Sequence, residues 1–227
     1  MLTSSCAAIY SDAVDCEKAP NGELTEEVWN TTSSLKNNPY SYSKTLAEKE
    51  AWEIANKQDR WDLVTINPSF VLGPPLSMKN KASESFNFLK QLGDGTFKSG
   101  IPDIGMGMVY VRDLAVAYYL AAFTPSAKGR YITSAHNGSF LAFAKALLPK
   151  FGDHYPIPKK ALPKAIVWLI GPILDKSVTR SFVSKNVNVA WKANNSKIKN
   201  KLGLSFRPLE TTMEDGFQAL VDAKVFS

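Results

Sequence analysis

The chain has 227 residues, of which 44% are hydrophobic and 21% are charged. This balance excludes an intrinsically disordered protein and predicts a globular one with a sizeable core. The formal charge is +6, but the lysines are spread along the sequence, so no nucleic-acid partner is expected. Two cysteines, Cys6 and Cys16, exclude a disulfide framework. We expect no signal peptide and a cytoplasmic location.

The first elements predict a strand, a helix and a second strand. Residues 1–10 begin as a strand with no turn before it, and an acidic, turn-rich loop follows. Residues 40–56 are rich in helix formers, contain neither glycine nor proline and follow Pro39, which predicts a helix. Residues 61–75 predict a buried strand stopped by prolines and then a loop. Elements in this order form a unit of parallel sheet.

The second half of the chain predicts more helices than strands. Strands are expected at 108–111 and 129–134. Helices are expected at 83–92, 112–123, 139–151, 162–170 and 211–223. No internal repeat or low-complexity tract interrupts this alternation.

Neither a metal site nor a membrane span is predicted. His136 and His154 have no second ligand at metal-binding spacing. Residues 165–175 form the most apolar stretch, but it has about half the length that a membrane span needs and contains a Gly-Pro break. We therefore expect these residues to form the end of a buried helix.

Two tyrosines and a lysine fall at the start of the predicted helix 40–56. Side chains four residues apart share a helix face, whereas side chains two apart do not. Tyr40 and Lys44 therefore lie on one face, and Tyr42 points elsewhere. An ammonium group one turn from a phenol favours the phenolate, which suits Tyr40 to give up a proton near neutral pH.

The end of the first predicted strand carries two hydroxyl groups. Ser4 and Ser5 point to opposite faces, so only one of them can face a ligand at the carboxyl edge of the sheet. Taken alone, the two serines indicate a turn in which they satisfy nearby backbone groups. Taken together, a hydroxyl at this strand end and the pair of Tyr40 and Lys44 can converge on a carbonyl oxygen. The sequence therefore predicts an acid site for carbonyl reduction.

Five ordered motifs resemble the extended short-chain dehydrogenase/reductases. They are "TSS" at 3–5, "YSYSK" at 40–44, "NPSFVLGP" at 67–74, "VYVRDLAVAY" at 109–118 and the segment 194–216. The resemblance runs nearly end to end. It is closest to the branch of dihydroflavonol reductases, cinnamoyl-CoA reductases and yeast-type aldehyde reductases.

This resemblance implies an α/β fold. It is the C-terminal part of a doubly wound, parallel-sheet domain of Rossmann type, together with a small mixed α/β substrate-binding region. Residues 1–75 would form the catalytic second half of the Rossmann-type domain. Residues 76–227 would mainly form the substrate-binding region, with 108–135 returning strands and a helix to the sheet. The family's glycine-rich half would precede Met1.

The resemblance also implies roles for individual residues. Ser5 would polarise the substrate carbonyl, Ser4 would pack, Tyr40 would donate the proton, and Lys44 would assist it and hold the nicotinamide ribose. A second set would contact the cofactor, which is expected to be NADP(H), with NAD(H) as the alternative: Pro68, Ser69 and Val71 at the nicotinamide and Ser83 at the phosphates.

The chain departs from the family at two places. It contains no glycine-rich phosphate-binding motif, so a truncation is inferred and weak binding of a dinucleotide is expected. Tyr10 and the "GMGM" segment with Met106 and Met108 stand where dihydroflavonol reductases have polar groups. We expect these residues and Cys6 to line the substrate pocket, with Cys6 as a small buried thiol, and a small carbonyl compound to be the substrate.

The leading hypothesis is an NAD(P)H-dependent aldehyde or ketone reductase. One alternative is a catalytically silent fragment or binding module of the same fold. Another is a nucleotide-sugar epimerase or a hydroxysteroid-type dehydrogenase that uses the same residues. The expected partners are a small-molecule carbonyl substrate and, in a homodimer, a second copy of the chain, without a membrane.

Overall fold

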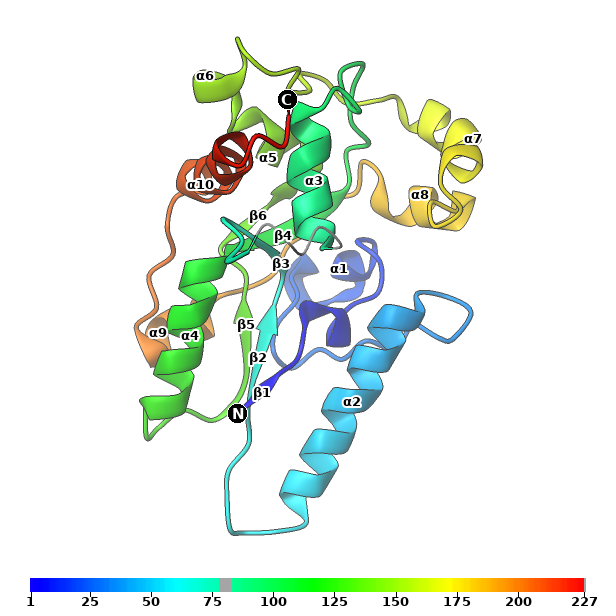
Figure 1. Ribbon diagram of the computed structural model, residues 1–227. Coiled ribbons are helices and arrows are strands. Elements are labelled where there is room, and N and C mark those ends of the chain that lie inside the picture. Colours follow the sequence, from blue (N-terminus) through cyan, green and yellow to red (C-terminus); the bar gives the residue numbers. More distant parts are fainter. Residues whose placement is uncertain (78–82, 227) are drawn as a thin grey trace.

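The computed structural model describes residues 1–77 and 83–226, which form two small sheets and the helices around them (Figure 1). The first sheet is parallel and has the order β1 (Leu2–Thr3), β2 (Val64–Pro68), β5 (Gly129–Thr133). Two longer helices, α2 (Pro39–Asn56) and α4 (Val111–Phe123), lie on either side of it (Figure 1). The predicted strand, helix and strand are therefore confirmed.

The two faces of the first sheet differ in chemistry. Val64 and Ile66 of β2 pack in an apolar cluster with Leu114 and neighbouring residues of α4. Thr65 and Asn67 alternate with them and hydrogen-bond toward α2 instead. Because successive side chains of a strand point to opposite faces, this one short strand supplies an apolar face to α4 and a polar face to α2.

The second sheet contains β3 (Phe70–Leu72), β4 (Gly105–Tyr110) and β6 (His136–Ser139) in the order β3-β4-β6. β3 follows β2 after Ser69 and pairs with β4 in parallel, and β6 pairs with β4 in antiparallel fashion. The expectation that 108–135 returns to the first sheet as a whole therefore needs a correction. β5 and α4 pack there, whereas β4 is already paired on both sides in the second sheet.

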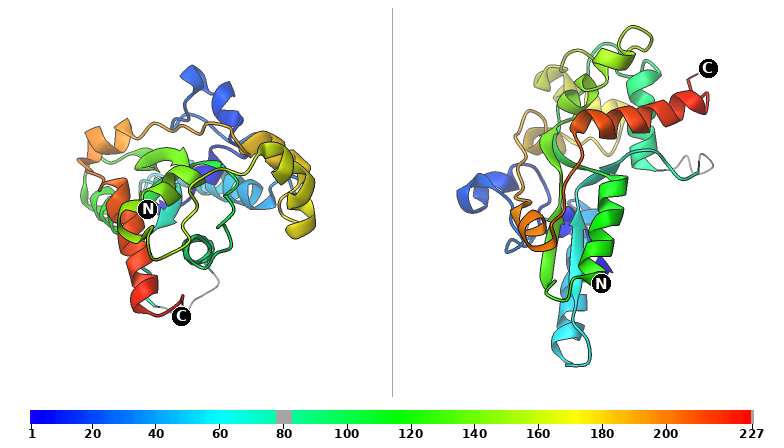
Figure 2. Two further views of the ribbon diagram at one scale, coloured as in Figure 1. Left: turned by 90° about the horizontal axis from the view of Figure 1, so that it is seen from above. Right: turned by 90° about the vertical axis from the view of Figure 1, so that its left-hand side faces the viewer.

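Four helices and the second sheet enclose the largest apolar core. They are α3 (Glu84–Gly93), α5 (Phe140–Lys145), α6 (Leu148–Phe151) and α10 (Leu209–Asp222). In the right-hand view of Figure 2, α10 (red) runs across the end of α4 (green). Phe217 of α10 packs against Phe151 in a tilted arrangement with ring centroids 4.7 Å apart, which joins the last helix to this core.

The remaining elements lie outside the two sheets and this core. They are the 3-10 turns η1 (Cys6–Ala8) and η2 (Pro20–Gly22), and the helices α1 (Asp15–Lys18), α7 (Lys164–Leu174), α8 (Arg180–Asn186) and α9 (Ser196–Leu202). Among the described residues, every helix is too short or too polar to cross a bilayer.

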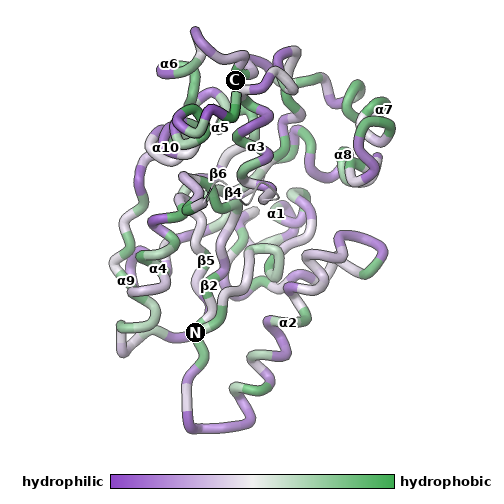
Figure 3. The backbone as a smooth tube through the Cα atoms, in the orientation of Figure 1, coloured by the Kyte–Doolittle hydropathy of each residue, from purple (hydrophilic) through white to green (hydrophobic). Residues whose placement is uncertain are grey.

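The apolar stretch 165–175 differs from its prediction. It forms a helix, α7, but Val167 is buried while most of its other large apolar side chains are exposed. The prediction of a buried helix end is therefore wrong. Residues of α8, together with Leu162 and Val178, pack against one side of α7, and the other large apolar side chains of the helix are exposed. The hydropathy-coloured tube shows α7 as an apolar stretch on the outer edge of the molecule (Figure 3).

Candidate functional site

The helix that carries the two tyrosines starts at a well-defined cap. Asn38 adopts a left-handed conformation (φ 55°), and its side-chain oxygen accepts a hydrogen bond from the amide of Ser41. Asparagine tolerates this conformation, and Pro39 suits the first helical position because it lacks an amide hydrogen. Asn38 also donates a hydrogen bond of 3.0 Å to the carbonyl of Ser11. The cap thus fixes where Tyr40 emerges from the helix.

Tyr40 and Lys44 lie together on α2, as their spacing predicts. The Lys44 ammonium nitrogen is 5.8 Å from the centroid of the Tyr40 ring. The Tyr40 side chain is 59% exposed and borders an open cavity. Tyr42 is not among the described residues that line this cavity. The structure therefore places Tyr40, rather than Tyr42, at the cavity.

A cavity of about 270 Å³ brings most of the predicted site residues together. Ser5 and Tyr40 line it from the end of β1 and the start of α2, and Pro68 and Ser69 line it from the end of β2. Ser5 also caps the turn η1, because its hydroxyl oxygen accepts a 3.1 Å hydrogen bond from the amide of Ala7. Side chains from two strand ends and one helix start thus face the same space.

The expected pocket residues divide between this cavity and the core. Cys6, Tyr10 and Met106 line the cavity. Met108 is fully buried in the core of the second sheet, so its predicted place in the pocket needs a correction. The reason is its register: Met108 is paired with Phe70 on one side and with a residue of β6 on the other.

Two of the predicted cofactor residues lie apart from Ser5 and Tyr40. Val71 and Ser83 line a neighbouring cavity of about 210 Å³ between β3 and α3. Ser83 caps α3, accepting a hydrogen bond of 3.3 Å from the amide of Phe86. Pro68 and Ser69 therefore line the same cavity as Tyr40. Val71 and Ser83 line the neighbouring cavity instead.

Cys6 and Tyr10 are packed groups that stay in their neutral forms. The Cys6 thiol donates a 3.2 Å hydrogen bond to the carbonyl of Asn67, and its burial raises its pKa far above the usual range. Tyr10 meets Trp191 edge to face with ring centroids 5.6 Å apart, and burial likewise raises the pKa of its phenol. Cys6 is therefore a small buried thiol, as expected, and Tyr10 is a wall of the cavity.

A buried carboxylate beneath the site was not predicted from the sequence. Glu48 is 1% exposed and lies one turn after Lys44 on α2. It accepts hydrogen bonds from Ser4 and from the side-chain nitrogen of Asn67 at 2.7 Å. Asn67 also donates to the carbonyl of Ser5 at 3.1 Å. Glu48 therefore links α2 to both strand ends that line the cavity.

Arg130 of β5 balances the charge of Glu48. Its Nε donates to Glu48 Oε1 at 2.7 Å, and its guanidinium lies 3.9 Å from the centroid of the Trp29 ring. Burial alone would raise the pKa of Glu48, but the hydrogen bond and charge of Arg130, with the bonds from Ser4 and Asn67, lower it overall. The pair is consequently ionised at neutral pH. No local sequence signal distinguishes Glu48 from the other glutamates of α2, because its charged partner Arg130 lies 82 residues away in the sequence.

A larger cavity adjoins the first one. It has a volume of about 590 Å³ and shares Asn38, Ile104, Met106 and Phe182 with the cavity at Tyr40. Because four residues line both spaces, the two form one elongated cleft. One end of this cleft lies at Ser5 and Tyr40.

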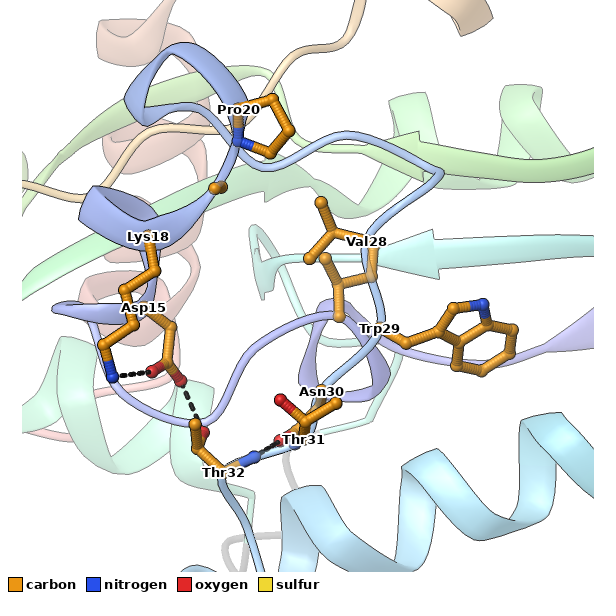
Figure 4. Close-up of a pocket in the computed structure, with 10 residues that line it drawn as sticks. Asp15, Lys18, Pro20, Val28, Trp29, Asn30, Thr31 and Thr32 are labelled. Atoms are coloured by element: carbon orange, nitrogen blue, oxygen red, sulfur yellow. Dashed lines mark hydrogen bonds and ion pairs between the residues drawn. The ribbon is translucent and has the colours of Figure 1, made fainter.

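A fourth cavity, of about 170 Å³, lies beside α1 and is separate from Tyr40 (Figure 4). Asp15 there accepts a 2.7 Å hydrogen bond from the hydroxyl of Thr32 and lies 3.7 Å from the ammonium of Lys18. Asn30 accepts from the amide of Thr32 at 3.1 Å. These polar groups are hydrogen-bonded or ion-paired with one another. The contacts hold the loop that precedes α2 against α1.

Comparison with known protein families shows to which family the chain belongs. Residues 1–133 match the model of the NAD dependent epimerase/dehydratase family. The chain belongs to this family. The match covers β1, α2, β2 and β5, and therefore all the strand ends and the helix that form the site.

Two cinnamoyl-CoA reductases resemble this member of the epimerase/dehydratase family along most of its length. Cinnamoyl-CoA reductase 2 of Medicago truncatula is 33% identical over 226 residues, which is 97% of this chain and 58% of the relative. Cinnamoyl-CoA reductase 1 of Arabidopsis thaliana is also 33% identical, over 97% of this chain and 56% of the relative. The chain thus spans somewhat more than half the length of these relatives.

Solved structures of family relatives share the fold. Yeast methylglyoxal/isovaleraldehyde reductase Gre2, complexed with NADPH, superposes with a TM-score of 0.73 at 25% identity, covering 100% of this chain and 64% of that one. Gre2 of Candida albicans in complex with NADPH gives a TM-score of 0.70 at 27% identity, covering 97% and 63%. The predicted α/β fold of Rossmann type is confirmed.

Proposed function

We propose that the site at Ser5 and Tyr40 belongs to an NADPH-dependent carbonyl reductase of the extended short-chain class. The observation that supports this most directly is the shared cavity: Ser5 and Tyr40 line it together, and Lys44 lies against the Tyr40 ring. The chain spans 56–58% of the two cinnamoyl-CoA reductases, so the activity is proposed for a protein that also has a nucleotide-binding half.

Each residue would act on the carbonyl group in a definite way. The Ser5 hydroxyl would donate a hydrogen bond to the carbonyl oxygen and polarise it. The Tyr40 phenol would then donate its proton to that oxygen as general acid. Lys44 would stabilise the tyrosinate that remains, and its ammonium would hold the ribose hydroxyls. A bound nicotinamide would supply the hydride.

The cavity suits a nicotinamide group at Pro68 and Ser69. The Ser69 hydroxyl is buried and has no hydrogen-bond partner within the described residues, although it belongs to the cavity wall. A buried polar atom without a partner is costly, and an amide-bearing ligand would satisfy it. Val71 and Ser83, in the neighbouring cavity, would lie toward the ribose and phosphate groups.

We predict that simple aliphatic or aromatic aldehydes are better substrates than dihydroflavonols. Tyr10 and Met106 give the cleft an aromatic and thioether wall, and the phenol of Tyr10 lies in contact with Trp191. This wall offers little hydrogen bonding to the hydroxyl groups of a flavonoid. A substrate panel with the full-length protein, followed by NADPH absorbance, checks the ranking, and a dihydroflavonol in first place would contradict it.

A second prediction concerns the 227-residue chain by itself. We expect it to bind NADPH weakly or not at all, because its sequence contains no glycine-rich loop to receive the pyrophosphate at a helix N-terminus. Isothermal titration calorimetry measures this directly. Tight binding would refute the need for a further nucleotide-binding half. If the full-length protein bound NADPH but reduced no carbonyl compound, the catalytically silent alternative would replace the reductase.

A further inference from the structure

Ser5 lies just beyond the point where the ladder between β1 and β2 ends. The Ser4 amide donates a 2.8 Å hydrogen bond to the carbonyl of Ile66, and Ser5 follows in an extended conformation (φ −163°, ψ 155°). Ladder donors recur at every second residue of a strand, so the next donor of β2 on this side would be residue 68. That residue is Pro68, which has no amide hydrogen. The backbone of β2 therefore leaves Ser5 to be held by other contacts.

The side chain of Asn67 supplies one of these contacts. Asn67 is fully buried, and its amide nitrogen donates to the Ser5 carbonyl at 3.1 Å and to Glu48 Oε2 at 2.7 Å. Its side-chain oxygen accepts a 3.2 Å hydrogen bond from the hydroxyl of Thr65. Because an ionised carboxylate and a carbonyl can only accept, the amide is held in one orientation, with its nitrogen toward both of them.

Asn67 acts on the site without lining it. Among the described residues, Ser5 belongs to the wall of the cavity at Tyr40 and Asn67 does not. The Ser5 hydroxyl oxygen accepts from the amide of Ala7, which leaves its proton available to a ligand. The Ser5 carbonyl accepts from the amide of Ala8 at 3.0 Å as well as from Asn67. The position of the hydroxyl therefore depends on a turn that Asn67 ties to β2.

We propose that Asn67 is a positioning residue for carbonyl reduction: it holds Ser5 so that the hydroxyl reaches the same carbonyl oxygen as the Tyr40 phenol. This role rests on the proposed reductase function. Two donors have to meet one oxygen, and a displacement of about 1 Å can lower the rate about a hundredfold. Asn67 sets their relative position, because its amide bonds both to Ser5 at the strand end and to Glu48 on the helix that carries Tyr40.

The first test measures this positioning in the 227-residue chain by hydrogen exchange. Asn67→Leu keeps a side chain branched at the same carbon but removes both donated hydrogen bonds. We expect the two amides that donate to Ser5 to exchange about threefold to tenfold faster, the factor that corresponds to one hydrogen bond. Asn195→Leu is the matched control. Its side chain donates to a different carbonyl after a strand, that of Ser134, at 2.7 Å, so the two amides should be unchanged.

The second test is a double-mutant cycle in the full-length protein, with NADPH and an aldehyde. We expect Asn67→Leu to lower the turnover number about tenfold to a hundredfold in the parent, and less than about twofold in the Ser5→Ala background. A residue that acts through the Ser5 hydroxyl loses its effect together with that hydroxyl. A residue with a purely structural role would cost the same factor in both backgrounds, and Asn195→Leu should cost little in either.

Thr65→Val covers the case in which circular dichroism shows that Asn67→Leu does not fold. Valine keeps the shape of threonine and lacks the hydroxyl that bonds to the Asn67 side-chain oxygen. We expect it to lower the turnover number about threefold, roughly the worth of one hydrogen bond, and to have no effect in the Ser5→Ala background. Equal effects in both backgrounds would count against the proposal as they would for Asn67→Leu.

The outcomes separate this role from the proposed function. Unchanged exchange at the two amides overturns the positioning role, and so do equal effects on turnover in both backgrounds, while the reductase function stands. If the full-length parent reduces no carbonyl compound, the reductase function fails and the positioning role fails with it, whatever the exchange rates show.

Discussion

Replacing Tyr40 with phenylalanine is expected to lower the turnover number by about two to four orders of magnitude, the usual contribution of a positioned general acid. The change removes only the hydroxyl and keeps the ring, whose centroid lies 5.8 Å from the Lys44 ammonium. Because the ring borders the cavity with Ser5, the loss falls on proton donation and not on packing. Steady-state kinetics of the full-length protein with NADPH and an aldehyde measure the effect.

Tyr42→Phe is the matched control for this experiment. Tyr42 lies two residues further along α2 and is not among the described residues that line the cavity, so its loss should cost little. Lys44→Met should be nearly as damaging as Tyr40→Phe, and the two changes should combine less than additively, because the pair acts as one unit. A damaging Tyr42→Phe beside a mild Tyr40→Phe would require the proposed general acid to be withdrawn.

Replacing Glu48 with glutamine is expected to lower the free energy of unfolding by about 3–5 kcal/mol. The substitution keeps the size of the side chain but leaves the buried guanidinium of Arg130 without its carboxylate partner. It also disturbs the hydrogen bonds from Ser4 and Asn67, which connect α2 to the strand ends. Urea denaturation of the parent chain and the variant measures the difference.

The same pair predicts a dependence on pH. The pKa of Glu48 is lowered in the folded chain, so its contribution is present above the unfolded pKa and is lost as the pH falls through the folded value. The stabilities of parent and Glu48→Gln should therefore begin to converge as the pH falls below about 4.3, the pKa of an unfolded glutamate, and continue to converge through the lower pKa of the folded chain. Glu53→Gln is the control: its partner is the exposed Lys57 on the same helix, so little change is expected. If Glu48→Gln and Glu53→Gln lowered the free energy of unfolding equally, burial of the Glu48–Arg130 pair would not increase its contribution to stability.

Local chemistry was sufficient to predict the helix and the tyrosine. Pro39 and the run without glycine placed the start of α2 within one residue, because both act through the backbone of their own segment. The spacing of Tyr40 and Lys44 fixed their common face for the same reason. Both features depend on contacts within a few residues, which a sequence displays directly.

Features that depend on distant partners were missed or misjudged. Glu48 meets Arg130 across 82 residues, and nothing local distinguishes it from the exposed Glu53 of the same helix. The resemblance places Met108 in the pocket, but its burial in β4 between two other strands is a tertiary property that the segment does not display. The residues of α7 were assigned to the interior because apolar character indicates that a helix needs a partner, without indicating whether the fold provides one.

The position of β1 in the first sheet has a practical consequence. Within the described residues, β1 is an edge strand of the first sheet: it pairs with β2 on one side, and no strand pairs with its other side. Such an edge accepts a further strand through main-chain hydrogen bonds alone, and the donor can belong to a separate polypeptide. The chain is therefore suited to fragment complementation: a nucleotide-binding half expressed as its own molecule could add to β1 and restore a reporter activity without a peptide bond between them.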